Sequence, residues 1–220
     1  MNYNTRMNKR TLLLICGLLC IASFFIFTLI VRTDVLRTVD FTLTVKVQDR
    51  LPQKIYRLFY LITESARFEI VILSLIVLLT ILKKWRLLLL ALFLFFTGHV
   101  VEYIGKIFLD QPPPPFMFYK VPNNMNWFPA AYSIEGNSYP SGHAMRAVFI
   151  AGMLMFAIGI NKRIPTYAQY GGYVVLCVFA AAVCMGKIAL GQHWTTDVIA
   201  GGLIGAGILF IWLSQATKNL

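Results

Sequence analysis

Residues 139–160 read YPSGHAMRAVFIAGMLMFAIGI, a short polar motif that runs directly into an apolar segment. Proline and serine commonly precede the first turn of a helix, and a glycine lets the backbone approach a ligand closely. The apolar run that follows, 144–160, comes close to the roughly 20 residues that a transmembrane helix needs. The stretch therefore predicts a membrane helix whose first turn lies at a membrane surface and carries polar side chains.

The rest of the chain repeats this apolar pattern. Of its 220 residues, 58% are hydrophobic and 13% are charged, which is far from the balance of a soluble globular protein. Six stretches have the length of a membrane span or come close to it. They are residues 11–31, 68–82, 87–103, 144–160, 171–190 and 197–214. We therefore predict an all-α protein, a six-helix transmembrane bundle that forms a single domain over residues 1–220.

The first apolar stretch follows three basic residues, Arg6, Lys9 and Arg10, so a cleavable signal peptide is one interpretation. Its apolar run of about 20 residues exceeds the usual 7–15 of a signal-peptide core, and no clear small-x-small cleavage site follows. We interpret the stretch as a retained membrane helix.

The formal net charge of +11 is concentrated in short connections and at the chain ends. Residues 83–86 (KKWR) and 161–163 (NKR) are basic clusters between predicted spans, and such clusters mark the cytoplasmic side. Together with the basic N-terminus and Lys218 they predict that both termini are cytoplasmic, as an even number of spans requires. The loop 106–141 then faces outward. This placement of charge favours a membrane topology signal over a nucleic-acid partner.

Two connecting segments have unusual compositions. Residues 32–67 mix charged with apolar side chains, which is typical of interfacial helices that lie on the bilayer. Their charges either form a solvated helix face, which we favour, or hold anionic headgroups. The outer loop contains the run Pro112–Pro115, which must be extended, and many aromatic residues. Those aromatics either sit at the headgroup level or line an entrance for a lipid.

Two of the three histidines lie where predicted helices meet the outer surface. His143 follows Ser141 and Gly142 at a helix start, where exposed N–H groups favour an anion, and a histidine there can donate a proton to a departing oxygen. His193 and Asp197 are four residues apart and share one face of a helical turn. A carboxylate there fixes the imidazole tautomer and leaves the other nitrogen free to attack phosphorus.

Three cations accompany the histidines. Lys187 is a point charge suited to phosphate oxygens, and Lys106 ends the third predicted span on the same outer side. Arg146 lies one turn after His143 inside an apolar span, where an arginine is a functional candidate by default. It either contacts the phosphate, snorkels to the surface, or pairs with Glu102 or His99 of the third span. For His99 itself we favour a packing or interfacial role.

These residues resemble the motifs of the type 2 phosphatidic acid phosphatase (PAP2) family, in its six-helix membrane branch. The family's motifs are Lys, six residues, Arg-Pro; then Pro-Ser-Gly-His; then Ser-Arg, five residues, His, three residues, Asp. Pro140–His143 match the second motif in full, and His193 and Asp197 keep the spacing of the third. The resemblance covers the chain from about Lys106 to Gly202.

The resemblance implies a role for each matching residue. His193 would be the nucleophile that forms a phosphohistidine, Asp197 would orient it, and His143 would protonate the leaving alcohol. No metal and no cofactor are expected, and the substrate would be an outer-leaflet lipid phosphate that enters sideways from the bilayer, such as a polyprenyl pyrophosphate or a glycerolipid phosphate. The residues that would hold the phosphoryl oxygens are Lys106, Ser141, Gly142 and Lys187.

The chain departs from the family pattern at three positions. Pro113 stands where the first motif has arginine, and Gly186 and Lys187 stand where the third has serine and arginine. Two arginines, each able to donate two parallel hydrogen bonds to a phosphate, are thus lost or reduced to a point charge. Arg146 is the candidate that compensates for this loss. Two rival interpretations are a phosphotransferase, and a non-catalytic lipid-binding or transport protein. The retained nucleophile, orienting carboxylate and acid favour an enzyme.

Overall fold

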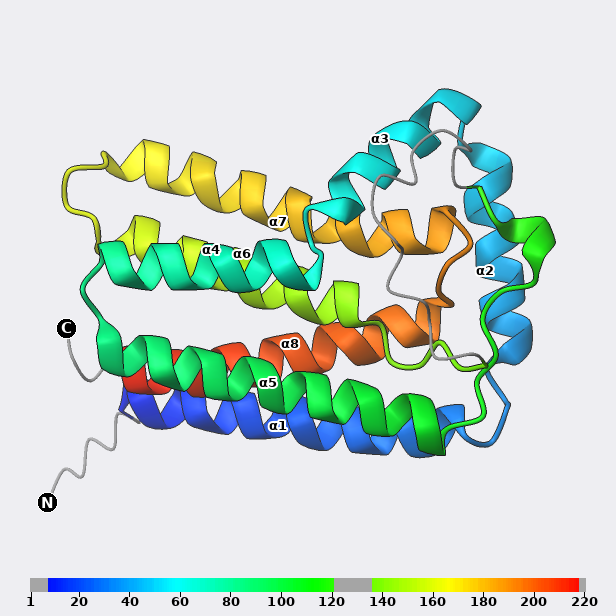
Figure 1. The fold of residues 1–220 in the computed structure, drawn as a ribbon, viewed down its shortest axis with the longest axis horizontal. Helices are drawn as coiled ribbons and strands as arrows, with labels where there is room; N and C mark the ends of the chain where they lie inside the picture. Colours follow the sequence, from blue (N-terminus) through cyan, green and yellow to red (C-terminus); the bar gives the residue numbers. More distant parts are fainter. Residues whose placement is uncertain (1–7, 121–135, 218–220) are drawn as a thin grey trace, which may run out of the picture.

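The structure is a computed structural model that describes residues 8–120 and 136–217. Within these residues the chain forms helices and no strands. Six helices run side by side along the long axis of the molecule (Figure 1). They are α1 (Lys9–Val31), α4 (Phe68–Ile81), α5 (Trp85–Phe108), α6 (Gly142–Ile160), α7 (Thr166–Ala189) and α8 (Thr195–Ala216).

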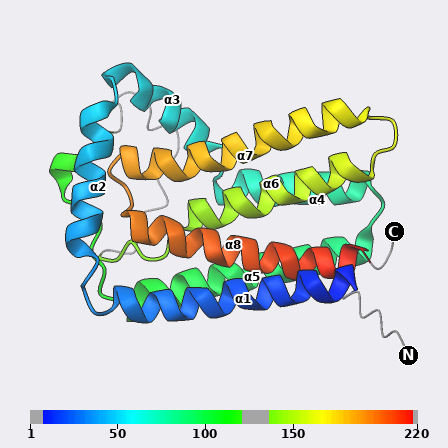
Figure 2. The same cartoon turned by 180° about the vertical axis from the view of Figure 1, so that it is seen from behind.

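The remaining elements gather at one end of this bundle. They are the helices α2 (Arg37–Arg50) and α3 (Gln53–Glu64) and the short 3-10 helix η1 (Phe116–Phe118). The start of α1 and the end of α8 lie at the opposite end, together with the α4–α5 and α6–α7 connections (Figures 1 and 2). The two basic clusters predicted to be cytoplasmic therefore lie at the same end as the start of α1 and the end of α8.

Five of the six predicted spans have the length and composition of a membrane helix: α1, α5, α6, α7 and α8. The sixth, α4, occupies the predicted range but has 14 residues, a length of about 21 Å, whereas the hydrocarbon core is about 30 Å thick. It is short because the turn at Ser65–Arg67 precedes it and two lysines follow its C-cap, Leu82.

Apolar side chains both fill the bundle and cover its outside. Trp212 of α8 is fully buried and donates its indole N–H to the carbonyl of Leu87 on α5 at 2.9 Å. Outward faces of the long helices also carry large exposed apolar side chains, among them Leu19, Phe25, Leu89, Phe93, Val175 and Val178. Such a surface is unfavourable in water and suits lipid. Together with the five span-length helices it makes the chain an integral membrane protein.

The segment 32–67 forms two helices, as its composition predicts, and they pack on the bundle. α3 contacts α7, and α2 contacts both α7 and α8. Asp40 and Thr44 of α2 are buried by this packing. The expectation of a solvated charged face is therefore wrong for Asp40, because that side chain points at the start of α8.

Candidate active site

The turn between α7 and α8 positions His193. Gly191 has a φ of +65°, in the left-handed region that favours glycine, and a Cβ there would run into the carbonyl of Phe118. After this residue, the backbone N–H groups of Gln192 and His193 donate to the carbonyl of Lys187 at 3.1 and 3.2 Å. His193 is thereby held beside the last turn of α7.

Asp197 orients the imidazole of His193, as the four-residue spacing predicts. Nδ1 of His193 lies 3.2 Å from Oδ2 of Asp197, and the same oxygen accepts the backbone N–H of Trp194 at 2.9 Å. Asp197 is fully buried. A carboxylate can only accept here, so Nδ1 carries the proton and Nε2 has the free lone pair that a nucleophile needs.

Burial also affects the protonation of His193. It lowers the pKa of the imidazole below its ordinary value, while the hydrogen bond with Asp197 acts in the opposite direction. The net result is a histidine that is neutral at pH 7. A neutral imidazole is the form that attacks phosphorus.

Close contact between α6 and α8 brings the second histidine to this place. A Cβ at Gly201 would run into the carbonyl of Ser141, and one at Gly205 would run into the carbonyl of Met145, so only glycine permits this approach of the two backbones. The backbone N–H of Ser141 also donates to the carbonyl of Asp197 at 2.9 Å. The N-termini of α6 and α8 therefore lie side by side.

Three unpartnered polar atoms mark this junction. In the part of the chain that the structure describes, four buried side-chain nitrogen or oxygen atoms have no hydrogen-bond partner: Thr44 Oγ1, Ser141 Oγ, His143 Nε2 and Asp197 Oδ1. Each such atom costs roughly 1–3 kcal/mol, so proteins seldom keep them without a reason. Three of the four belong to the residues that the sequence predicts as one site.

Positive charge surrounds the same junction. Lys187 is only 4% exposed and donates from Nζ to Oε1 of Gln192 at 2.7 Å. Lys106, in the last turn of α5, donates to Oε1 of Glu102 at 2.9 Å. The charges of Lys187, Arg146 and Lys106 all act on the imidazole of His143. The structure thus brings together every residue that the sequence predicts for the site.

Arg146 is held by three partners. Its Nε donates to the carbonyl of Ala66 at 2.8 Å, one Nη donates to Nε2 of His99 at 3.1 Å, and the same Nη lies 3.6 Å from Glu102. Guanidinium only donates, so His99 is neutral and its Nδ1–H donates to the carbonyl of Phe95 at 2.8 Å. Of the three options for Arg146, these contacts match pairing with a carboxylate.

Sequence reasoning missed the role of Asp40. Its two carboxylate oxygens accept the backbone N–H of Thr196 at 2.9 Å and the hydroxyl of Thr196 at 2.6 Å, which caps the start of α8. Burial raises the pKa of this carboxyl group, while the bonds to Thr196 oppose the rise. The sequence feature that could have indicated this role is a single acidic residue between two apolar ones, Val39 and Phe41.

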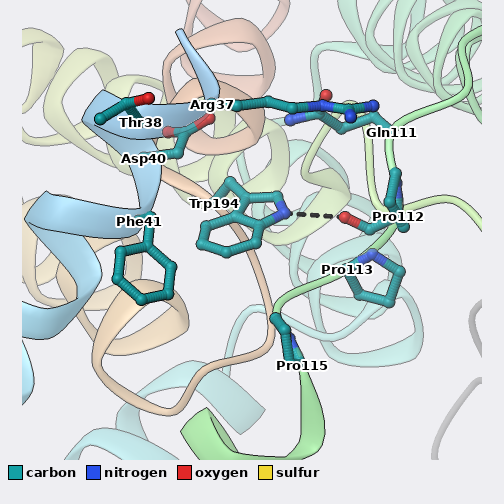
Figure 3. A pocket seen from close by; sticks show the side chains of 9 residues that line it. All are labelled: Arg37, Thr38, Asp40, Phe41, Gln111, Pro112, Pro113, Pro115 and Trp194. Carbon is teal, nitrogen blue, oxygen red and sulfur yellow. Dashed lines mark hydrogen bonds between the residues drawn. The ribbon is translucent and has the colours of Figure 1, made fainter. Parts of the chain in front are cut away.

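A cavity of about 490 Å³ lies next to the turn that carries His193 (Figure 3). Trp194 forms one wall and donates its indole N–H to the carbonyl of Pro112 at 2.7 Å. Pro113, where the family motif has arginine, lines the same cavity as Arg37 of α2. The full lining is Arg37, Thr38, Asp40, Phe41, Gln111, Pro112, Pro113, Pro115 and Trp194.

No metal-ligating role is assigned to any of these residues. Across residues 8–120 and 136–217, no three histidine, cysteine, aspartate or glutamate side chains come together in a cluster that could hold a metal ion.

Comparison with known proteins identifies the family. The model of the PAP2 superfamily matches residues 83–220, which is more than half of the chain, and the protein therefore belongs to the PAP2 superfamily. The fold agrees with this assignment. A transmembrane PAP2-type phosphatidylglycerolphosphate phosphatase from Bacillus subtilis has a TM-score of 0.72 at 18% identity, covering 93% of this chain and 96% of that one. LpxE of Aquifex aeolicus has a TM-score of 0.57 at 19% identity, covering 80% and 94%.

Two curated relatives match only over part of their length. The chain is 30% identical over 80 residues to lipid phosphate phosphatase delta of Arabidopsis thaliana. It is 32% identical over 85 residues to phosphatidylglycerophosphatase B of Escherichia coli (strain K12). Each match covers 36% of this chain, but 19% of the plant protein and 30% of the bacterial one. The matched region thus spans less than a third of these relatives.

Proposed function

We propose that this protein hydrolyses a lipid phosphate through a phosphohistidine intermediate on His193. The observation that carries the proposal is the group of three unpartnered buried atoms, on Ser141, His143 and Asp197, beside an oriented neutral imidazole. A phosphoryl group would provide partners for the serine hydroxyl and His143. Family membership and the names of the relatives support the same reaction class.

Each residue has a defined task in this reaction. Nε2 of His193 attacks phosphorus while the bond from phosphorus to the alcohol oxygen breaks, and His143 gives that oxygen its proton. Asp197 stabilises the imidazolium that forms. Water then attacks the phosphohistidine and gives a proton to His143, inorganic phosphate leaves, and His193 is regenerated. Lys106, Lys187, Ser141 and the first N–H groups of α6, beginning at Gly142, hold the phosphoryl oxygens.

The charge around the site supports this reaction despite the missing family arginines. Lys187 provides a buried point charge in place of one arginine. Arg146 adds a guanidinium whose positive charge acts on His143 from a distance and that does not donate two hydrogen bonds to the phosphate. Electrostatic stabilisation of a phosphoryl group depends on preorganised positive charge in a site of low dielectric constant. Three buried or half-buried cations meet that requirement.

We also propose that the site faces outward and that both termini are cytoplasmic, with residues 1–220 forming one membrane domain. The basic connections lie at the end opposite to the starts of α6 and α8, which supports this orientation. A reporter enzyme that is active only outside the cytoplasm, fused after the last residue, should be inactive. The same reporter inserted in the α5–α6 connection should be active, and the reverse pattern would overturn the orientation.

The function is tested by phosphate release from purified protein without any acceptor. The panel contains a polyprenyl pyrophosphate, phosphatidylglycerol phosphate and phosphatidic acid. We expect release of inorganic phosphate from at least one of them. Transfer of the phosphoryl group to an added acceptor alcohol, without release of inorganic phosphate, would instead identify a phosphotransferase. Neither release nor transfer from any of the three would favour a lipid-binding protein.

The lowered pKa of His193 predicts the pH dependence of the rate. Because the imidazole stays neutral as the pH falls through about 6.5, the acid limb of the kcat/KM profile should have its midpoint below that pH. Asp197→Asn removes the partner that raises this pKa, so the midpoint should move to still lower pH as the rate falls. A profile recorded from pH 4.5 to 8 checks both shifts, and a midpoint above 6.5 in the unaltered protein would contradict the assignment.

A further inference from the structure

Glu102 of α5 has contacts that the proposed reaction does not use. Its carboxylate accepts from Lys106 at 2.9 Å and lies 3.6 Å from Arg146. Its side chain is only 13% exposed. On a third side it lies directly against Gly142, where an added Cβ would run into both carboxylate oxygens. Glu102 therefore reaches from α5 to the first turn of α6. There it lies between Gly142, which precedes His143, and Arg146, which follows it by three residues.

These contacts place a fixed negative charge inside an anion site. Lys106 and Gly142 are two of the groups proposed to hold the phosphoryl oxygens, and Glu102 touches both. Its carboxylate also neutralises Arg146, the other cation on this side of the site. An incoming phosphoryl group must share these cations with Glu102 and meets its repulsion at short range. A site selected only for tight phosphate binding would lack such a carboxylate.

We propose that Glu102 is a specificity-determining residue that acts as an internal counter-anion and weakens the hold of the site on inorganic phosphate. The proposal rests on the proposed function. A lipid phosphate has additional binding from its apolar chains and tolerates this competition, whereas the free phosphate product depends on the cations alone. Glu102 therefore favours release of the product and weakens the binding of small inorganic anions to the site.

The test compares Glu102→Gln with the unaltered protein and with Asp110→Asn. Asp110 is exposed, just past the end of α5, so its replacement removes the same charge from the same side of the molecule. Binding of inorganic phosphate and orthovanadate is measured through inhibition of lipid phosphate hydrolysis and through the rise in unfolding temperature that each anion causes. Glu102→Gln should lower both inhibition constants at least about tenfold, and Asp110→Asn should leave them unchanged.

A second pair of variants keeps the test valid if Glu102→Gln does not fold. Lys106→Met should weaken phosphate binding, and adding Glu102→Gln to it should restore binding towards that of the unaltered protein. A double variant that binds phosphate no more tightly than Lys106→Met would overturn the role of Glu102. So would a folded Glu102→Gln with unchanged inhibition constants. If the unaltered protein releases no inorganic phosphate from any lipid of the panel, the proposed phosphatase function itself fails.

Discussion

Replacing His193 with glutamine should reduce phosphate release by at least about a thousandfold, because the reaction then has no nucleophile. The fold should persist, since the turn that carries His193 is held by backbone hydrogen bonds to Lys187 and by Gly191. The measurement is release of inorganic phosphate from the best substrate of the panel. Acid-stable and acid-labile phosphate on the protein are determined in parallel, because a phosphohistidine is acid-labile.

His99→Gln is the matched control for this experiment. His99 is also a half-buried histidine near the site, but it accepts from Arg146 through Nε2, and a glutamine side chain can also accept a hydrogen bond. Its activity should stay within severalfold of that of the unaltered protein. Full activity in His193→Gln would refute the phosphohistidine mechanism, and equal losses in both variants would show that the loss reflects damage to the fold.

Arg146→Met should lower the free energy of unfolding by about 3–5 kcal/mol, the usual effect of removing one partner from a buried ion pair. The side chain is 8% exposed and donates to the carbonyl of Ala66, to His99 and towards Glu102. Without it, Lys106 is the cationic partner that Glu102 keeps among the described residues, and the carbonyl of Ala66 loses its donor. Unfolding of the detergent-solubilised protein by heat or denaturant measures the change.

Arg37→Met serves as the control for this change. Arg37 pairs with Asp34 at 2.8 Å, but both side chains are more than half exposed, and such a pair contributes at most about 1 kcal/mol. The combination Arg146→Met with Glu102→Gln should be more stable than Arg146→Met alone, since it removes the under-compensated carboxylate. A loss below 1 kcal/mol for Arg146→Met would show that its three contacts do not support the fold.

The apolar runs predict most of the fold because each buries itself in lipid or in the bundle wherever it lies in the chain. The five spans that end at Val31, Phe108, Ile160, Ala189 and Ala216 match their predicted ranges to within five residues at each end. The range 68–82 also forms a helix at the predicted place, α4 (Phe68–Ile81), but its 14 residues are fewer than a membrane span needs.

In the candidate site, the sequence predicts contacts between residues that are close in the chain, but not contacts between distant segments. His193 and Asp197 lie within one turn, so their spacing predicts their contact. The roles of Asp40 and Glu102 depend on packing between distant segments: Asp40 caps α8 from α2, and Glu102 reaches α6 from α5. No spacing along the chain encodes those contacts. The same is true of Arg146. The sequence left phosphate contact, snorkelling and pairing with Glu102 or His99 open, and the packing places the guanidinium beside both His99 and Glu102.

Because of Gly201 and Gly205, the distance between the two histidines is set by the close approach of two helix backbones and not by any catalytic side chain. His143 and His193 belong to different helices, and α6 and α8 meet where no side chain separates them. A methyl group at either glycine would act as a wedge between the acid and the nucleophile. The protein could then keep every reactive group, fold into the same bundle and still lose the alignment on which an in-line transfer of phosphorus depends.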